Sequence, residues 1–239
     1  MPASGQRSPD GRQARWDRHN QERRQQILAA ALAVVEEGEP GAEFHVQQIA
    51  ERAGLGRTVV YRHFQDRADL DRAIQAQILE DLTGRLLPAV TLDGTVNEII
   101  ERIVSTYVGW VVAHPALHRF AEQETSGPLQ HGIHQIAGVV VEVLETAIEM
   151  LGVELEADDR AAVDPLAFGL VGAVLAAVRR WVSREEQLPS ARQLSALLSD
   201  SVWHILDGHA RRLGLEIDPN LPIEELLGIP DPEASRTAP

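Results

Sequence analysis

Apolar residues near the start of the chain recur with the spacing of amphipathic helices. Between residues 27 and 35 they stand three or four positions apart, and Gly38 follows as a helix breaker. Two shorter helical patterns cover about 46–53 and 57–64, and the triplet Gly54-Leu55-Gly56 separates them. The pattern therefore predicts three consecutive helices in the first part of the chain.

The rest of the chain also has the periodicity of helices. A long apolar stripe begins after Asp66, whose spacing to Asp69 is that of a helix cap, and it ends before Pro88. Further helical patterns, bounded by glycine or proline, cover about 96–113, 115–123, 128–151, 160–183 and 190–213, with a short one near 223–227. No segment has the sustained alternation of a strand, so the sequence predicts an all-α fold in which a small three-helix bundle precedes a larger helical domain.

The second and third predicted helices have the composition of a helix-turn-helix. Ala53 is small enough for close packing, Gly54 can adopt the positive φ of a helix end, and Leu55 can fill the turn. Val60 and Phe64 lie one turn apart and are predicted to form the buried side of the third helix. The remaining positions form an exposed polar and basic arc: Arg57, Thr58, Val59, Tyr61 and Arg62.

The place of a residue on this arc predicts its part in DNA binding. A recognition helix inserts its N-terminal end into the major groove, so Arg57, Thr58 and Val59 are expected nearest to the base edges. The guanidinium of Arg57 matches the two acceptors of a guanine. Gln47, near the start of the preceding helix, is a second candidate base contact.

Residues farther along the recognition helix are candidate phosphate contacts. Tyr61, Arg62 and His63 are expected to meet backbone oxygens, which position the helix without reading sequence. Arg67, in the first turn of the next helix, is expected to join them.

The distribution of charge decides whether DNA is a plausible partner. A net charge of −14 argues against nucleic-acid binding if it is spread evenly. Residues 1–72 instead contain equal numbers of arginine and acidic residues, and the acidic excess lies in residues 73–239. The N-terminal arginines, from Arg7 to Arg24, form either a solvated disordered arm or an additional DNA contact.

The segment from Phe44 to Phe64, followed by Asp66-Arg67-Ala68-Asp69-Leu70, resembles the DNA-binding domain of the TetR family of bacterial repressors. The resemblance covers about 22–73. It implies a three-helix DNA-binding domain, a long fourth helix, and an all-helical C-terminal domain that dimerises through its last two long helices and holds an effector pocket.

Two positions depart from the family pattern. His45 stands where family members usually have a threonine that caps the second helix and touches phosphate, and Gly56 replaces a serine-like cap. A histidine can still donate to phosphate, with a strength that depends on pH.

The resemblance and the charge distribution together define four expected segments. These are a disordered arginine-rich arm (1–17), a helix-turn-helix DNA-binding domain (18–66), a helical effector-binding and dimerisation domain (67–215) and a proline-rich tail (216–239).

The last two long helices are apolar enough to form a dimer interface. Apolar and small residues cover most of the circumference between about 163 and 182, and a narrower stripe runs from Leu194 to Leu206. Pairing with symmetry mates would give an isologous four-helix interface. A homodimer is also needed because two recognition helices about one DNA turn apart read a palindromic operator.

Aromatic and histidine side chains in the predicted C-terminal helices are candidates for an effector pocket. Each of them is an ordinary core residue in the alternative interpretation. If they converge, they favour a lipophilic effector of unknown identity. The candidates are Tyr107, Trp110, Val111, His114, Phe120, His134 and Phe168.

Other functional classes receive little support. The chain has no cysteine, no glycine-rich phosphate loop and no catalytic constellation, so we expect no enzyme activity and no cofactor. The histidine pairs His114/His118 and His131/His134 lack further ligands, and no metal site is expected. No apolar run of about 20 residues is evident, and a cytoplasmic location without membrane contact is expected.

Two alternatives remain open at this stage. The chain is either a regulator or, in the alternative interpretation, an all-helical small-molecule carrier or enzyme that does not bind DNA. A regulator can also act as an activator, because the sign depends on where the operator lies.

Overall fold

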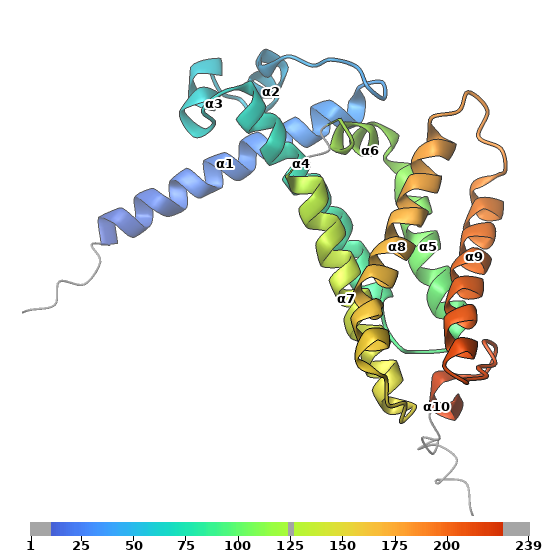
Figure 1. Cartoon of the computed structure of the whole chain (residues 1–239). Coiled ribbons are helices and arrows are strands. Elements are labelled where there is room, and N and C mark those ends of the chain that lie inside the picture. Colours follow the sequence, from blue (N-terminus) through green and yellow to red (C-terminus); the bar gives the residue numbers. More distant parts are fainter. Residues whose placement is uncertain (1–10, 124–126, 227–239) are drawn as a thin grey trace, which may run out of the picture. The chain divides into compact units, whose positions relative to one another are not determined.

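A computed structural model describes residues 11–123 and 127–226 (Figure 1). These residues fold into helices joined by loops, and no strand occurs among them. The helices are α1 (Gly11–Glu37), α2 (Val46–Arg52), α3 (Arg57–His63), α4 (Arg67–Leu86), η1 (Leu87–Ala89), α5 (Val96–Ala113), α6 (Pro115–Ala121), α7 (Pro128–Met150), α8 (Ala157–Val182), α9 (Ala191–Arg212) and α10 (Ile223–Leu226). The all-α fold predicted from the sequence is confirmed.

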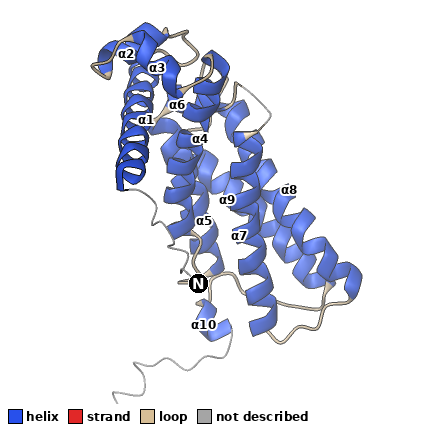
Figure 2. Ribbon diagram, turned by 90° about the vertical axis from the view of Figure 1, so that its left-hand side faces the viewer, coloured by secondary structure: helices blue, strands red, loops and turns tan. Residues whose placement is uncertain are grey.

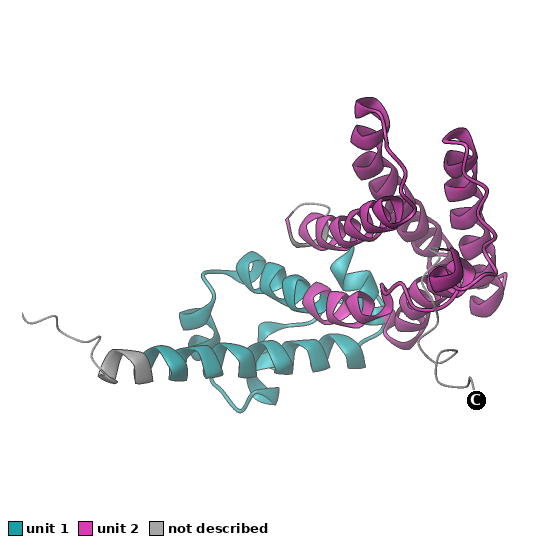
Figure 3. Ribbon diagram, turned by 90° about the horizontal axis from the view of Figure 1, so that it is seen from below, with its two compact units in different colours: residues 1–78, 116–124 teal, residues 79–115, 125–239 magenta. Residues whose placement is uncertain are grey.

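The chain forms two compact units, coloured separately in Figure 3. Unit 1 comprises residues 1–78 and 116–124, and unit 2 comprises residues 79–115 and 125–239. The division falls inside α4, so one continuous helix contributes to both units. Helix α6 belongs to unit 1 although α5 and α7, its neighbours in the chain, belong to unit 2.

The boundaries differ from the sequence prediction at two places. Helix α1 begins at Gly11, so residues 11–17 are helical rather than disordered, and residues 1–10 lie outside the described part of the chain. Unit 1 also extends past the expected domain of residues 18–66, because the first half of α4 and all of α6 pack within it. Of the expected tail, residues 227–239 lie outside the description.

The core of unit 1 is built from one buried face of each of its N-terminal helices, which lie together in Figure 2. Ile27 of α1, Ile49 of α2 and Val60 of α3 are fully buried. Gly54 has φ of 65°, a conformation that an L side chain rarely adopts, and it turns the chain from α2 toward α3. The amide of Leu55 then donates to the carbonyl of Ala50 at 2.8 Å and closes the end of α2.

Unit 2 is a bundle of two helix pairs. Helix α5 packs against α9, and α7 packs against α8. Thr95 caps the N-terminus of α5, where its hydroxyl accepts a hydrogen bond from the backbone amide of Glu98. Ser190 and Gln193 form an equivalent capping box at the N-terminus of α9. These caps satisfy backbone donors that would otherwise lack partners at each helix start.

Helix α8 contains a long, strongly apolar stretch. By length and composition alone it could cross a membrane, the one such helix in the described part of the chain, which the sequence analysis did not anticipate. Only 22% of its most apolar 18-residue window is buried within the chain. Most residues of this window are thus only partly buried or exposed in the chain.

Candidate DNA-binding surface and effector cavity

Helix α3 presents the arc predicted from the sequence. Val60 and Phe64, at its end, are buried in unit 1, whereas Arg57, Thr58 and Arg62 are exposed. The Arg57 guanidinium lies 5.6 Å from the centroid of the Tyr61 ring, one turn along the same face. The exposed face of α3 is therefore basic and aromatic, as a groove-binding helix requires.

Contacts from α1 fix the orientation of α3. The guanidinium of Arg24 donates to the carbonyl oxygen of His63 at 2.9 Å and stacks 4.2 Å from the centroid of the Phe64 ring. Two residues later, the amide of Gln26 donates to the carbonyl oxygen of Ala53 at 2.8 Å. Helix α1 thus holds the C-terminal ends of both α2 and α3, where carbonyl groups lack partners within the helices.

His63 lies half-buried among cationic side chains. Burial lowers the pKa of its imidazole below the ordinary value, and the charges of Arg23, Arg24 and His19 lower this pKa further. Near neutral pH the ring is therefore predominantly uncharged in the free protein.

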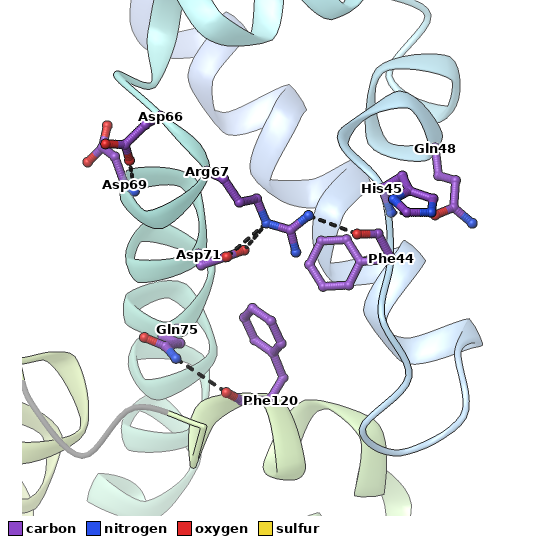
Figure 4. Close-up of polar contacts among 9 residues, drawn as sticks. All are labelled: Phe44, His45, Gln48, Asp66, Arg67, Asp69, Asp71, Gln75 and Phe120. Carbon is purple, nitrogen blue, oxygen red and sulfur yellow. Dashed lines mark hydrogen bonds and ion pairs between the residues drawn. The ribbon is translucent and has the colours of Figure 1, made fainter.

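The N-terminus of α2 is capped by an unusual pair of residues (Figure 4). The backbone N–H of His45 donates to the side-chain oxygen of Gln48 at 2.6 Å. The His45 ring is exposed, as a candidate phosphate donor must be. Gln47 is exposed as well, and its amide donates to Glu51 at 2.7 Å on the same helix.

Arg67 is engaged within unit 1 and does not extend freely toward solvent (Figure 4). Its Nε lies 2.8 Å from both carboxylate oxygens of Asp71, and one terminal nitrogen donates to the carbonyl oxygen of Phe44 at 2.8 Å. The guanidinium also stacks 4.2 Å from the centroid of the Phe44 ring. The structure gives Arg67 a positioning role, since it ties α4 to the segment that precedes α2.

Helix α6 completes the packing around Phe44. The rings of Phe44 and Phe120 lie 5.4 Å apart, and the side-chain amide of Gln75 donates to the carbonyl oxygen of Phe120 at 3.3 Å (Figure 4). Phe120 is therefore part of the core of unit 1.

Unit 2 contains a cavity of about 310 Å³ between its helix pairs. Its walls come mainly from aliphatic residues of α5, α7, α8 and α9. The α7 wall alone runs from Ile136 to Leu151, roughly 22 Å at the rise of an α-helix. A cavity so apolar favours a lipophilic ligand over water, because water needs polar partners.

Polar side chains in the cavity wall are few. Asp159 and Arg212, which both line the cavity, form an ion pair at 2.7 Å between the N-terminal end of α8 and the C-terminal end of α9. His209 lies one turn before Arg212, and Tyr107 on α5 contributes a buried hydroxyl-bearing ring. The charged groups of the wall thus gather near these ends of α8 and α9.

The structure does not bring the seven expected pocket residues together. Tyr107 lines the cavity, whereas Trp110 and Val111 are buried outside its wall. The ring of His114 lies 5.7 Å from that of Trp110, also outside the wall. Phe120 is in the other unit, as shown above.

His134 and Phe168 do meet, but elsewhere. Their rings pack edge to face at 4.7 Å between α7 and α8, outside the cavity wall. Sequence reasoning favoured aromatic and histidine side chains and missed the aliphatic wall. The signal available was the width of the apolar surface on α7 and α8, which exceeds what one packed face of a helix needs.

Metal ligands do not cluster in the described residues. No group of three or more histidine, cysteine, aspartate or glutamate side chains is placed to hold an ion there.

Comparisons with known proteins agree with this architecture. Residues 27–74 match the model of the tetR family of bacterial regulatory proteins. An uncharacterised HTH-type transcriptional regulator of Mycobacterium tuberculosis is 27% identical over 200 residues, which cover 83% of each chain. The match extends beyond the helix-turn-helix into the helical body.

Two solved structures share the fold at low sequence identity. A tetR-family transcriptional regulator from Streptomyces coelicolor superposes with a TM-score of 0.63 at 18% identity, covering 90% of this chain and 94% of that one. The transcriptional regulator FadR from Bacillus subtilis, solved with stearoyl-CoA, gives a TM-score of 0.54 at 19% identity, covering 74% and 96%.

The fold and the exposed basic helix of unit 1 define a helix-turn-helix, DNA-binding transcriptional regulator, a class distinct from enzymes. Within that class, residues 27–74 match the TetR family of bacterial regulators, and the chain as a whole has the fold of a TetR-family structure.

The internal contacts of Arg67 lead to a prediction about stability. Arg67→Ala removes the ion pair with Asp71 and both contacts to Phe44, so we expect a loss of about 1–2 kcal/mol within unit 1. Hydrogen exchange should accelerate about tenfold in peptides of α2 and α4. The salt dependence of DNA binding should stay unchanged. If the slope of log affinity against log salt concentration became smaller while hydrogen exchange stayed normal, a direct contact between Arg67 and a DNA phosphate would be supported instead.

Proposed function

We propose that the protein is a cytoplasmic homodimeric repressor that binds a palindromic operator and is released by a small lipophilic effector. The observation that carries this proposal is the exposed basic face of α3. Burial of Val60 and Phe64 leaves that face a single orientation, outward from unit 1. The match to the TetR family supports DNA binding, and the apolar cavity of unit 2 supports release by a ligand.

The contacts with DNA follow from position on α2 and α3. Exposed Arg57 and Thr58, with Val59 beside them, meet base edges in the major groove. Gln47 adds a base contact after it releases Glu51. A second set contacts the phosphate backbone: His45, Tyr61, Arg62 and His63.

The dimer forms through the outer faces of α8 and α9. On α9, Leu197 is 55% exposed and Ile205 is 42% exposed. On α8, a stripe of small residues that includes Gly169 and Ala173 is exposed, and nothing lies within 4 Å of a Cβ built on Gly169. Small residues permit close approach of helices, so these faces fit an isologous four-helix interface.

The effector is an aliphatic molecule with a polar end. The cavity wall is almost wholly carbon, and its charged groups gather where Asp159 pairs with Arg212. A long hydrocarbon chain fits the length of the wall, and an anionic group can replace Asp159 as the partner of Arg212. The structural neighbour solved with stearoyl-CoA supports a ligand of this kind.

Helix α4 connects ligand and DNA. Leu70 and Ile74 are fully buried in unit 1, while Leu86 at the other end of the same helix lines the cavity. A ligand that favours one position of Leu86 therefore favours one position of α4. The effector releases DNA if it binds this position of α4 more tightly than it binds the position that α4 adopts on the operator.

Reading of the bases by α3 can be tested with one substitution. Arg57→Ala should reduce discrimination between operator and scrambled DNA by about tenfold or more, because a bidentate arginine–guanine contact is worth about 1–3 kcal/mol. Fluorescence anisotropy with DNA flanking the protein's own gene measures this effect. Arg160→Ala, an exposed arginine of α8, is the matched control. If the wild type shows no sequence preference, the repressor proposal fails and a carrier without DNA binding becomes the better interpretation.

The dimer interface is testable by charge insertion. The double variant Leu197→Glu, Ile205→Glu should be monomeric in light scattering and should bind the operator far more weakly, since one recognition helix provides few contacts. Val112→Glu changes an equally exposed apolar residue of α5 and should remain dimeric. A dimeric double variant would place the interface on other helices.

Filling the cavity should separate effector response from DNA binding. Ala147→Trp places a large ring in the α7 wall, so stearoyl-CoA or a free long-chain fatty acid should no longer release operator DNA, whose affinity stays nearly normal. Ala113→Trp adds the same ring at an exposed position outside the wall. Unchanged release from Ala147→Trp would contradict an effector site in this cavity.

A further inference from the structure

Helix α1 is longer than its packing in unit 1 requires. It runs from Gly11 to Glu37, yet its first fully buried residue is Ile27. Residues 16–22 are all exposed, and Trp16 is 62% exposed. Figure 1 shows this half of α1 continuing past α2 and α3. A helical segment that buries so little gains no stability from packing, which suggests that it serves a partner.

Basic side chains gather where α1 passes the end of α3. Arg24 is fixed there by its bond to the His63 carbonyl and its stack on Phe64. Arg23, the adjacent residue, donates to the side-chain oxygen of Gln26 at 3.1 Å. His19 lies one turn earlier on α1, and its charge, like those of Arg23 and Arg24, acts on His63.

Few carboxylates lie near this group of basic side chains to neutralise their charge. One carboxylate, that of Glu22, lies 3.9 Å from the His19 ring. Among the described residues, no carboxylate is paired with Arg23, Arg24 or His63. In a chain with a net charge of −14, a cluster beside the recognition helix with more basic than acidic groups is a specific feature, and it matches an anionic partner.

We propose that Arg23 and His19 of α1, together with His63 of α3, form a binding site for one phosphodiester group of the operator backbone. The site lies beyond the bases read by α3. Arg24 positions the site, because its own donors and ring contact are committed to α3. The inference rests on the proposed function and extends the DNA-binding surface from the helix-turn-helix to α1.

The site also links DNA binding to protonation. Burial and the facing charges of Arg23, Arg24 and His19 lower the pKa of His63 in the free protein, and Glu22 lies beside His19 on α1. A bound phosphate favours the charged imidazole and raises that pKa. DNA binding therefore takes up protons, and operator affinity should increase as pH falls from the pKa of His63 in the complex toward its lowered pKa in the free protein.

The test is the salt dependence of operator binding by the full-length protein. Arg23→Gln should weaken binding about tenfold, equally for operator and scrambled DNA, and should reduce the salt slope by about one per protomer. Arg160→Gln, which removes an exposed arginine from unit 2, should change neither value. Normal circular dichroism and light scattering exclude a folding defect; the side chain of Arg23 is only partly buried and bonds to Gln26 of the same helix.

A second variant tests the histidine. His63→Gln should measurably reduce the increase in operator affinity at lower pH; His45 and His19 contribute the remainder. If the wild type binds the operator and Arg23→Gln matches Arg160→Gln in affinity and salt slope, the phosphate site on α1 is wrong and the proposed function stands. If the wild type shows no preference for the operator, the proposed function itself has failed.

Discussion

Burial of Val60 and Phe64 is the constraint on which DNA recognition depends. Helix α3 has only seven residues, too few to be stable or oriented on its own. Its direction is imposed by these two side chains on one face and by Arg24 at its end. The same packing decides which residues remain exposed. Recognition and stability are thus properties of opposite faces of one short helix, and a base-reading residue can change without cost to the core.

Unit 2 differs from unit 1 in its packing, because the space between its helix pairs is incompletely filled. The α5–α9 pair and the α7–α8 pair border a partly open aliphatic cavity of about 310 Å³. Protein interiors are normally close-packed, and the lining of an empty cavity forfeits dispersion contacts. A lipophilic molecule restores those contacts, so binding stabilises whichever arrangement of the two pairs fits it best. In the proposed function this loose packing lets unit 2 respond to a ligand, whereas the packing of unit 1 fixes the recognition helix.

Sequence periodicity predicted the helices well and their partners less well. The bounds of α5 agree with the expected 96–113, since proline, glycine and capping residues act locally. Arg67 and Phe120 were assigned to DNA and to the pocket because sequence shows the chemistry of a side chain but not which neighbour satisfies it. Phe44, distant in sequence, contacts both. The aliphatic cavity wall was missed for a related reason, since a leucine facing a cavity and a leucine facing another leucine have the same pattern.

The placement of α6 has a consequence for how this protein can be divided. Unit 1 is not a continuous stretch of sequence: a fragment that ends at Ile78 would lack Phe120, and the ring of Phe44 would lose its aromatic neighbour. Exchanging N-terminal segments between family members would have the same effect, because the donor's helix-turn-helix would meet a foreign α6. A functional chimera therefore has to carry residues 116–124 along with residues 1–78, and evolution of the two segments is expected to be coupled.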